Sequence, residues 1–207
     1  LGLKLATGIV GLAGGSLVLT LILTMIAALV LGTGLPTSAT YIITSIMAAP
    51  ALEQLGVPKL VAHMFVFYFG NLADLTPPTA ISTYATSSIA GADVWKTQWL
   101  AMTLALSGFI IPFSFAYDPA LLLMGSSIPH IALRTVMATL GIVMLGAGLI
   151  GYFRRRTSPL ERALLLAGAL LLIFPGVVSD LAGIACFVVV LVSQRAARPA
   201  RATTEVA

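Results

Sequence analysis

Two short segments of the sequence combine glycine, threonine and proline in a way that suits ion binding rather than catalysis. The first covers residues 32–38, Gly-Thr-Gly-Leu-Pro-Thr-Ser, and the second covers residues 76–79, Thr-Pro-Pro-Thr. Proline removes a backbone donor and clashes with the preceding turn, so neither segment continues a regular helix. An interrupted helix leaves free carbonyls that coordinate a cation such as Na⁺, and its new N-terminus attracts an anionic group.

Asp74 is the ionisable residue closest to the second segment, and Asn71 lies on the same helical face. An ionisable residue deep in an apolar stretch is costly and is a functional candidate, in this case for ion coupling. Asp74 fits equally well as a helix-end carboxylate capped by nearby amides. His63 fits a proton relay or, more simply, a histidine packed at the membrane interface. Hydroxyl residues between 82 and 88 either line a solute path or bond neighbouring helices.

No arrangement of residues typical of an enzyme is present. The sequence lacks a Gly-x-Ser-x-Gly elbow, a His-Glu-x-x-His motif and a Walker phosphate loop. The two histidines, His63 and His130, have no carboxylate at metal-ligand spacing. We therefore expect no catalytic residue and no organic cofactor.

The composition is that of a polytopic membrane protein. The chain has 207 residues, of which 59% are hydrophobic and 9% charged, and its mean hydropathy is +1.06. A soluble domain carries about a quarter charged residues. This excludes a secreted disulfide scaffold, a disordered tail and a cytosolic enzyme, and no basic-aromatic pattern indicates a nucleic-acid surface. The single cysteine, Cys186, is expected to be a buried, inert thiol.

Several apolar stretches have the wrong length for one crossing of the bilayer, which takes roughly 20 helical residues. Residues 16–31 and 41–53 reach only about 24 and 20 Å, so with the tip at 32–38 they predict a re-entrant helical hairpin. Residues 60–89 would reach about 45 Å, which predicts a discontinuous helix broken at 76–79. The fold class predicted is an all-α polytopic membrane protein that combines these two features.

The remaining stretches predict ordinary crossings at 98–117, with a kink at Pro112, and at 130–153. Residues 160–192 form a hairpin broken at 174–180, with halves of about 15 and 12 residues, or else a single crossing. Asp93 and Asp118 are expected in solvated loops. The predicted organisation is a transport half-repeat at 1–93, two transmembrane helices at 94–153, a C-terminal membrane hairpin at 154–193 and a flexible basic tail at 194–207.

Lys and Arg residues predict the orientation, because cytoplasmic loops are enriched in both. This rule places Arg154, Arg155 and Arg156 in the cytoplasm. If residues 160–192 form a hairpin that returns to the cytoplasmic side, eight of these cations lie inside and two, Lys59 and Arg134, lie outside. A single final crossing divides them evenly, so the hairpin is favoured.

The same segments resemble a known family. The first segment, with Ala-Pro-Ala-Leu at 49–52 and Leu-Gly-Val-Pro at 55–58, is similar to the large (M-type) membrane subunit of TRAP transporters, the tripartite ATP-independent periplasmic transporters. The runs at 63–69 and 75–80 continue the match. Residues 151–180 resemble the C-terminal extension of the fused permease, in which small and large membrane subunits form one chain.

The resemblance implies the second inverted repeat of an elevator-type ion transporter in the bacterial inner membrane. It implies Na⁺-coupled uptake of organic acids, which a periplasmic solute-binding protein delivers. By the same resemblance, a largely backbone Na⁺ site is expected at Gly32, Thr33, Gly34, Thr76 and Pro77. Half of the substrate site is expected at Thr37, Ser38 and Thr79.

The alternative is an H⁺-coupled organic-anion transporter without a binding protein, with Asp74 and His63 as relay residues. A passive membrane scaffold is a third possibility, in which the two breaks are kinks without a ligand. The chain opens Leu-Gly-Leu-Lys without Met, so we expect it to be part of a longer protein whose upstream region supplies the small membrane subunit or its fused equivalent.

Overall fold

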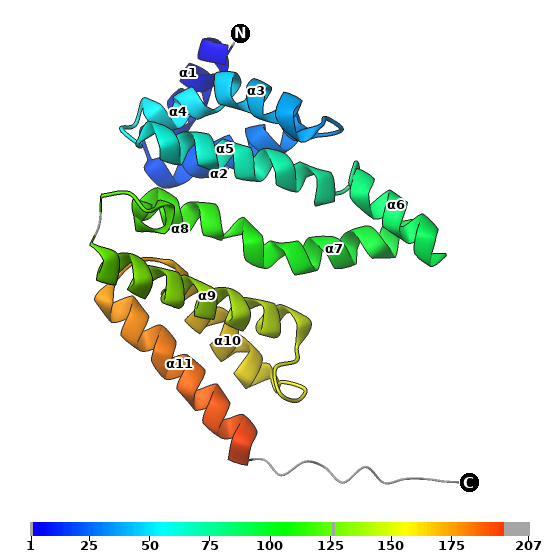
Figure 1. The fold of residues 1–207 in the computed structure, drawn as a ribbon, viewed down its shortest axis with the longest axis vertical. Coiled ribbons are helices and arrows are strands. Elements are labelled where there is room, and N and C mark those ends of the chain that lie inside the picture. The colour runs from blue at the N-terminus through cyan, green and yellow to red at the C-terminus, as the bar shows by residue number, and fades with distance from the viewer. Residues whose placement is uncertain (1, 126, 197–207) are drawn as a thin grey trace.

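The computed structural model describes residues 2–125 and 127–196, and all regular secondary structure in those ranges is helical (Figure 1). The one strand-like feature there is an isolated bridge between Tyr152 and Arg156. In chain order the elements are α1 (Gly2–Ala13), α2 (Leu17–Gly32), α3 (Thr37–Met47), α4 (Ala49–Glu53), α5 (Lys59–Leu72), η1 (Ala73–Leu75), α6 (Ile81–Ala90), α7 (Val94–Phe109), α8 (Ile111–Tyr117), η2 (Pro119–Leu122), α9 (Ile128–Ile150), α10 (Pro159–Ile173) and α11 (Val177–Ala196).

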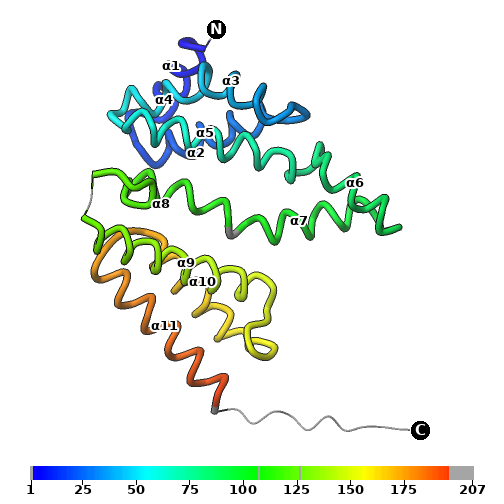
Figure 2. Tube along the Cα trace, viewed as in Figure 1, coloured from blue at the N-terminus to red at the C-terminus, as the bar shows by residue number. Residues whose placement is uncertain are grey.

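Helices α1 to α5 form a compact unit at the N-terminal end of the molecule, and α9 to α11 form another at the opposite end, with α7 and α8 between them (Figure 2). Helix α5 is central to the first unit because apolar residues at helical spacing, among them Phe65 and Phe69, are fully buried. The Phe65 and Phe69 rings lie 4.8 Å apart, and Phe69 also packs edge-on against Phe109 of α7 at 5.8 Å. Aromatic packing therefore ties α5 to the helices that follow it.

Both segments singled out in the sequence contain a break in regular helix. Residues 33–36 connect α2 to α3, a shorter turn than residues 32–38, because Gly32 ends α2 and Thr37 begins α3. Residues 76–80 separate η1 from α6, and the Pro77–Pro78 bond within them is cis. Two consecutive prolines cannot donate the hydrogen bonds of a continuing helix, which is why the chain leaves it here.

Within the part of the chain that the structure describes, three helical segments are long and apolar enough to cross a membrane: Val94–Tyr117, Ile128–Ile150 and Val177–Arg195. The first contains a break at Ile110, two residues before Pro112, whose ring clashes with the carbonyl four residues earlier. Helix α9 ends at Ile150 rather than 153, because Gly151 has a φ of 77° and terminates the helix.

The C-terminal region 160–192 is a helical hairpin of α10 and α11 packed on α9. The expectation of about 12 residues for its second half was wrong: α11 has 20 residues, since Val177 to Asp180 form its first turn and the helix continues beyond Val192 to Ala196. Small residues allow the close approach, as a Cβ on Gly183 would lie 2.9 Å from the carbonyl oxygen of Gly168. The predicted tail at 194–207 lies outside the described residues from 197 onward.

Asp118 was expected in a solvated loop, and this was wrong. Its side chain is only 17% exposed and contacts His130 at 3.0 Å and Arg134 at 3.7 Å. Arg134 also forms a two-pronged pair with Asp180 at the start of α11, with a shortest N–O distance of 3.0 Å. This cluster joins η2, α9 and α11 at one end of the C-terminal unit. Asp93 remains exposed and caps α7 by accepting from the Lys96 amide at 2.8 Å.

Candidate functional site

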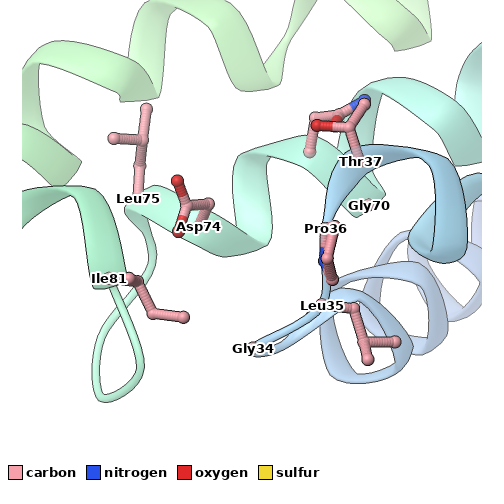
Figure 3. A pocket seen from close by; sticks show the side chains of 9 residues that line it. Gly34, Leu35, Pro36, Thr37, Gly70, Asp74, Leu75 and Ile81 are labelled. Atoms are coloured by element: carbon pink, nitrogen blue, oxygen red, sulfur yellow. The ribbon is translucent and has the colours of Figure 1, made fainter.

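The turn after α2 and the helix ends on either side of the break before α6 line one cleft. The cleft has a volume of about 570 Å³, and Figure 3 shows the turn on one side and the end of α5 with the start of α6 on the other. Its lining comes from the turn at Gly34, Leu35, Pro36 and Thr37, and from the broken helix at Gly70, Asn71, Asp74, Leu75 and Ile81. Two segments about 40 positions apart in sequence therefore enclose a single space.

Glycine at two positions permits this approach. A Cβ on Gly32 would overlap the carbonyl oxygen of Gly70 and would lie 3.1 Å from the Cβ of Ala73. A Cβ on Gly70 would lie 2.6 Å from Cγ2 of Thr40. Since real Cβ atoms do not come that close, the turn and α5 reach their observed separation only with glycine at both positions.

Local hydrogen bonds hold the turn in shape. Gly34 has a φ of 72°, a left-handed conformation that favours glycine. The Thr33 hydroxyl donates to the carbonyl of Val30 at 2.7 Å, and the Thr40 hydroxyl donates to the carbonyl of Leu35 at 3.3 Å. The Thr40 amide also donates to the Pro36 carbonyl at 2.9 Å, which starts α3. The first turn of α3 is thus fixed beside the cleft.

The break is bridged by side chains on both sides. The Ser82 hydroxyl, in the first turn of α6, donates to the Asp74 carboxylate in η1. The Thr76 hydroxyl donates to the Leu72 carbonyl at 2.8 Å, and the Ala80 amide donates to the Thr76 carbonyl at 3.2 Å. Asp74 therefore connects the two halves of the broken helix while also lining the cleft.

The cleft offers oxygen donors and one negative charge, which suit a cation. Asp74 is the single ionisable side chain in its lining, beside the Asn71 amide and the Thr37 hydroxyl. These groups and the backbone carbonyls are hard oxygen donors, which fit an alkali cation. Within residues 2–125 and 127–196, no three His, Cys, Asp or Glu side chains are grouped so that they could hold a metal. Softer transition-metal chemistry has no ligands there.

The residues predicted from the sequence fall into three groups. Gly34, Thr37 and Asp74 line the cleft. Gly32 packs against α5, and the hydroxyls of Thr33 and Thr76 are used in local bonds. The others lie beside the cleft: Ser38 is exposed in the first turn of α3, Pro77 is in the break, and Thr79 has a buried hydroxyl without a partner among the described residues.

The lining residues Gly70, Leu75 and Ile81 were not identified from sequence, whereas Leu35 and Pro36 belong to the segment 32–38. Gly70 carried one usable signal, because it is the only small residue in the otherwise bulky run at 64–72. A glycine at such a position marks close backbone approach.

His63 does not line the cleft and contacts other residues. Its Nε2 lies 3.2 Å from Oε1 of Glu53, and its Nδ1 lies 3.1 Å from the hydroxyl of Tyr41. His63 and Asp74 are separated by 11 positions along α5 and η1, which is about 16 Å of helix. The structure thus pairs each with other partners, Asp74 with Ser82 and His63 with Glu53 and Tyr41.

In residues 2–125 and 127–196 the chain is all-helical, with three segments long enough to span a bilayer and with interrupted helices around a cleft. These features define a polytopic membrane protein of the permease class. Residues 1–131 match the family described as tripartite ATP-independent periplasmic transporter, DctM component. The chain belongs to this family, and it is an inner-membrane permease component rather than an enzyme. No curated protein and no solved structure matches it.

Proposed function

We propose that the chain is part of a Na⁺-coupled permease that takes up organic acids, delivered by a periplasmic solute-binding protein. The observation that carries the proposal is a cleft with a single acidic side chain, lined by the turn after α2 and by the helix ends that flank the break before α6. Irregular backbone at membrane depth survives only where it is buried in protein or lines a polar cavity. In this proposal α2 and α3 are the re-entrant hairpin, and α5 and α6 are the two halves of the discontinuous helix.

The coupling ion is assigned to the backbone of the turn and of the break. In this proposal, backbone carbonyls of the turn at Thr33 and Gly34 and of the break at Thr76 and Pro77 coordinate the cation, and Asp74, which lines the cleft, supplies the negative charge. Gly32 contributes through packing, since its missing side chain lets the turn approach α5. The cation then joins the hairpin to the broken helix, and its binding energy stabilises their association.

The substrate is assigned to the helix N-terminal side of the same cleft. Thr37 and Ser38 stand in the first turn of α3, where free amides carry partial positive charge. Thr79 precedes α6 and has a buried hydroxyl that finds no partner within the described residues. No Lys or Arg lines the cleft, so a carboxylate would be held by amides, hydroxyls and the bound cation.

This arrangement also explains why the chain should act with partners. Residues 17–90 provide one hairpin and one broken helix, which is one of the two inverted repeats expected for an elevator-type transporter. The other repeat would supply the opposing half of the substrate site. A small membrane subunit, or its fused equivalent, and a periplasmic binding protein complete the proposed system.

The test is uptake by the complete permease in proteoliposomes with its binding protein, screened over labelled dicarboxylates, keto acids and sugar acids. We expect uptake that requires both an inward Na⁺ gradient and the binding protein, and that is lost in Asp74→Asn. Uptake driven by a pH gradient without Na⁺ would instead support the H⁺-coupled alternative. Normal uptake after Thr76, Pro77 and Pro78 are all replaced by alanine would support the passive scaffold.

A further inference from the structure

The loop between α9 and α10 has an ordered, alternating structure. The Phe153 amide donates to the Arg155 carbonyl at 3.2 Å, and the Thr157 amide donates to the Gly151 carbonyl at 3.0 Å. These bonds accompany the strand-like bridge between Tyr152 and Arg156. Side chains of such an extended hairpin alternate in direction, with a period of two.

The alternation divides the side chains of this loop into two sets. Phe153 and Arg155 are half-buried: the Phe153 ring packs 5.9 Å from that of Phe187, and Arg155 pairs with Glu161 at 3.0 Å. Tyr152, Arg154 and Arg156 are exposed. Neither the Arg154 nor the Arg156 side chain has a hydrogen bond or ion pair anywhere in residues 2–125 and 127–196. The loop therefore displays two exposed guanidinium groups that have no partner among the described residues.

Other cations near the loop are already engaged. Arg162 donates to the carbonyls of Gly148 and Leu149 at 2.7 and 2.8 Å, which closes the C-terminus of α9. Arg155 is held by Glu161 and by the carbonyl of Ser193. The network of Glu161, Ser158 and Ser193 keeps the loop in place. The side chains of Arg155 and Arg162 thus stabilise the loop, whereas those of Arg154 and Arg156 make no contact of this kind in the part of the chain that the structure describes.

The position of the loop at the end of a membrane-spanning helix places it, by inference, at the membrane surface. It begins one residue after α9, a 23-residue helix long enough to cross a bilayer, and Tyr152 has the amphipathic ring typical of headgroup depth. Lys96 at the start of α7 and Arg195 at the end of α11 lie at the same end of the bundle, since α7 and α9 run in opposite directions (Figure 1). This excess of cations marks the cytoplasmic side.

We propose that Arg154 and Arg156, with Tyr152, form a binding site for the phosphate of an anionic phospholipid headgroup, such as phosphatidylglycerol, in the inner leaflet. Guanidinium groups bind phosphate oxygens in a two-pronged geometry, and the ordered loop holds both groups in place before the lipid arrives. The site is independent of the cleft between α2 and α6. It would anchor the C-terminal unit at a fixed depth in the bilayer.

Native mass spectrometry of the purified permease, titrated with phosphatidylglycerol or phosphatidylcholine, tests this proposal. We expect Arg154→Gln and Arg156→Gln each to weaken phosphatidylglycerol binding about fivefold, with phosphatidylcholine binding unchanged. Lys59→Gln is the matched control, because it removes an exposed cation at the far end of the membrane region and should change neither lipid. Millimolar inorganic phosphate, added as a competitor, should not displace the lipid.

Three results would overturn the proposal. Unchanged phosphatidylglycerol binding in the double variant would exclude the loop as the site. An equal loss in Lys59→Gln would show a non-specific charge effect, and displacement by inorganic phosphate would show a free-anion site. The melting temperature of the double variant in phosphatidylcholine alone should equal that of the unaltered protein, and a large fall would assign the two arginines a structural role instead.

Discussion

Replacing Gly70 by alanine should separate the turn from the broken helix without touching any proposed ligand side chain. The added Cβ would lie 2.6 Å from Cγ2 of Thr40, whereas ordinary contact begins near 3.4 Å, so α3 must retreat by about 0.8 Å. Overpacking of this kind costs about 1–3 kcal/mol of folding free energy. A cation held by oxygens from both segments would lose its geometry, since displacements near 1 Å are costly at organised sites.

We expect Gly70→Ala to raise the Na⁺ concentration for half-maximal uptake on the order of tenfold. The variant Thr40→Ser removes the clashing methyl group and keeps the hydroxyl that donates to Leu35. The next atoms near the new Cβ, on Thr44, are at 3.5 and 3.7 Å and need not move. The double variant should therefore recover most of the Na⁺ affinity, which a double-mutant cycle measures as a favourable coupling energy.

Gly8→Ala is the matched control, because a Cβ there would meet no atom within 4 Å and lies in α1, away from the cleft. Its Na⁺ dependence should equal that of the unaltered permease. If Gly70→Ala also retained normal Na⁺ dependence, or if Thr40→Ser failed to restore an impaired Gly70→Ala protein, close packing of the turn on α5 would not be what forms the site.

Three further variants test other parts of the structure. Asp74→Asn should abolish Na⁺-driven uptake while the protein remains folded, as judged by size-exclusion chromatography, because it removes the one charge in the cleft. Ser158→Ala should lower the unfolding free energy by about 0.5–2 kcal/mol in a denaturation series, because it deletes the capping box of α10. Arg134→Met should destabilise the protein by about 3 kcal/mol, because it leaves Asp180 half-enclosed and unpaired, and adding Asp180→Leu should recover much of this loss.

Each of these has a clear contrary result. Retained Na⁺ coupling in Asp74→Asn would show that the ion binds at a site other than the cleft. An unchanged denaturation midpoint in Ser158→Ala would mean that the Glu161 side chain alone suffices to cap α10. Failure of the second substitution to rescue Arg134→Met would show that Arg134 acts mainly through Asp118 and His130.

The helical elements could be predicted from sequence because local chemistry dictates them. Two adjacent prolines at 77 and 78 cannot lie within a helix, and Gly34 and Pro36 end one helix and precede another. Membrane segments were recognisable from their length and hydropathy. Boundaries were less certain: α11 begins at Val177, before the expected point, because nothing in Val-Val-Ser-Asp opposes a helical first turn.

Contacts between distant residues could not be predicted in this way. The role of Gly70 depends on its contacts with Thr40 and Gly32, which are 30 and 38 positions away. The residues next to Gly70 in sequence do not indicate these contacts. The pairing of Arg134 with Asp180 likewise crosses 46 positions. Of the cleft, the sequence therefore indicated the breaks and the acidic group, while the surfaces that close it depend on tertiary packing.

Equilibrium binding of radioactive ²²Na⁺ to the purified complete permease tests the central claim most directly. If the turn at 33–36 and the break at 76–80 hold one ion between them, Gly34→Ala in the turn and Asp74→Asn at the break should each reduce the number of bound ions by one, and combining them should remove no more. Unchanged stoichiometry in either variant, or separate losses that add in the double variant, would contradict a single shared site.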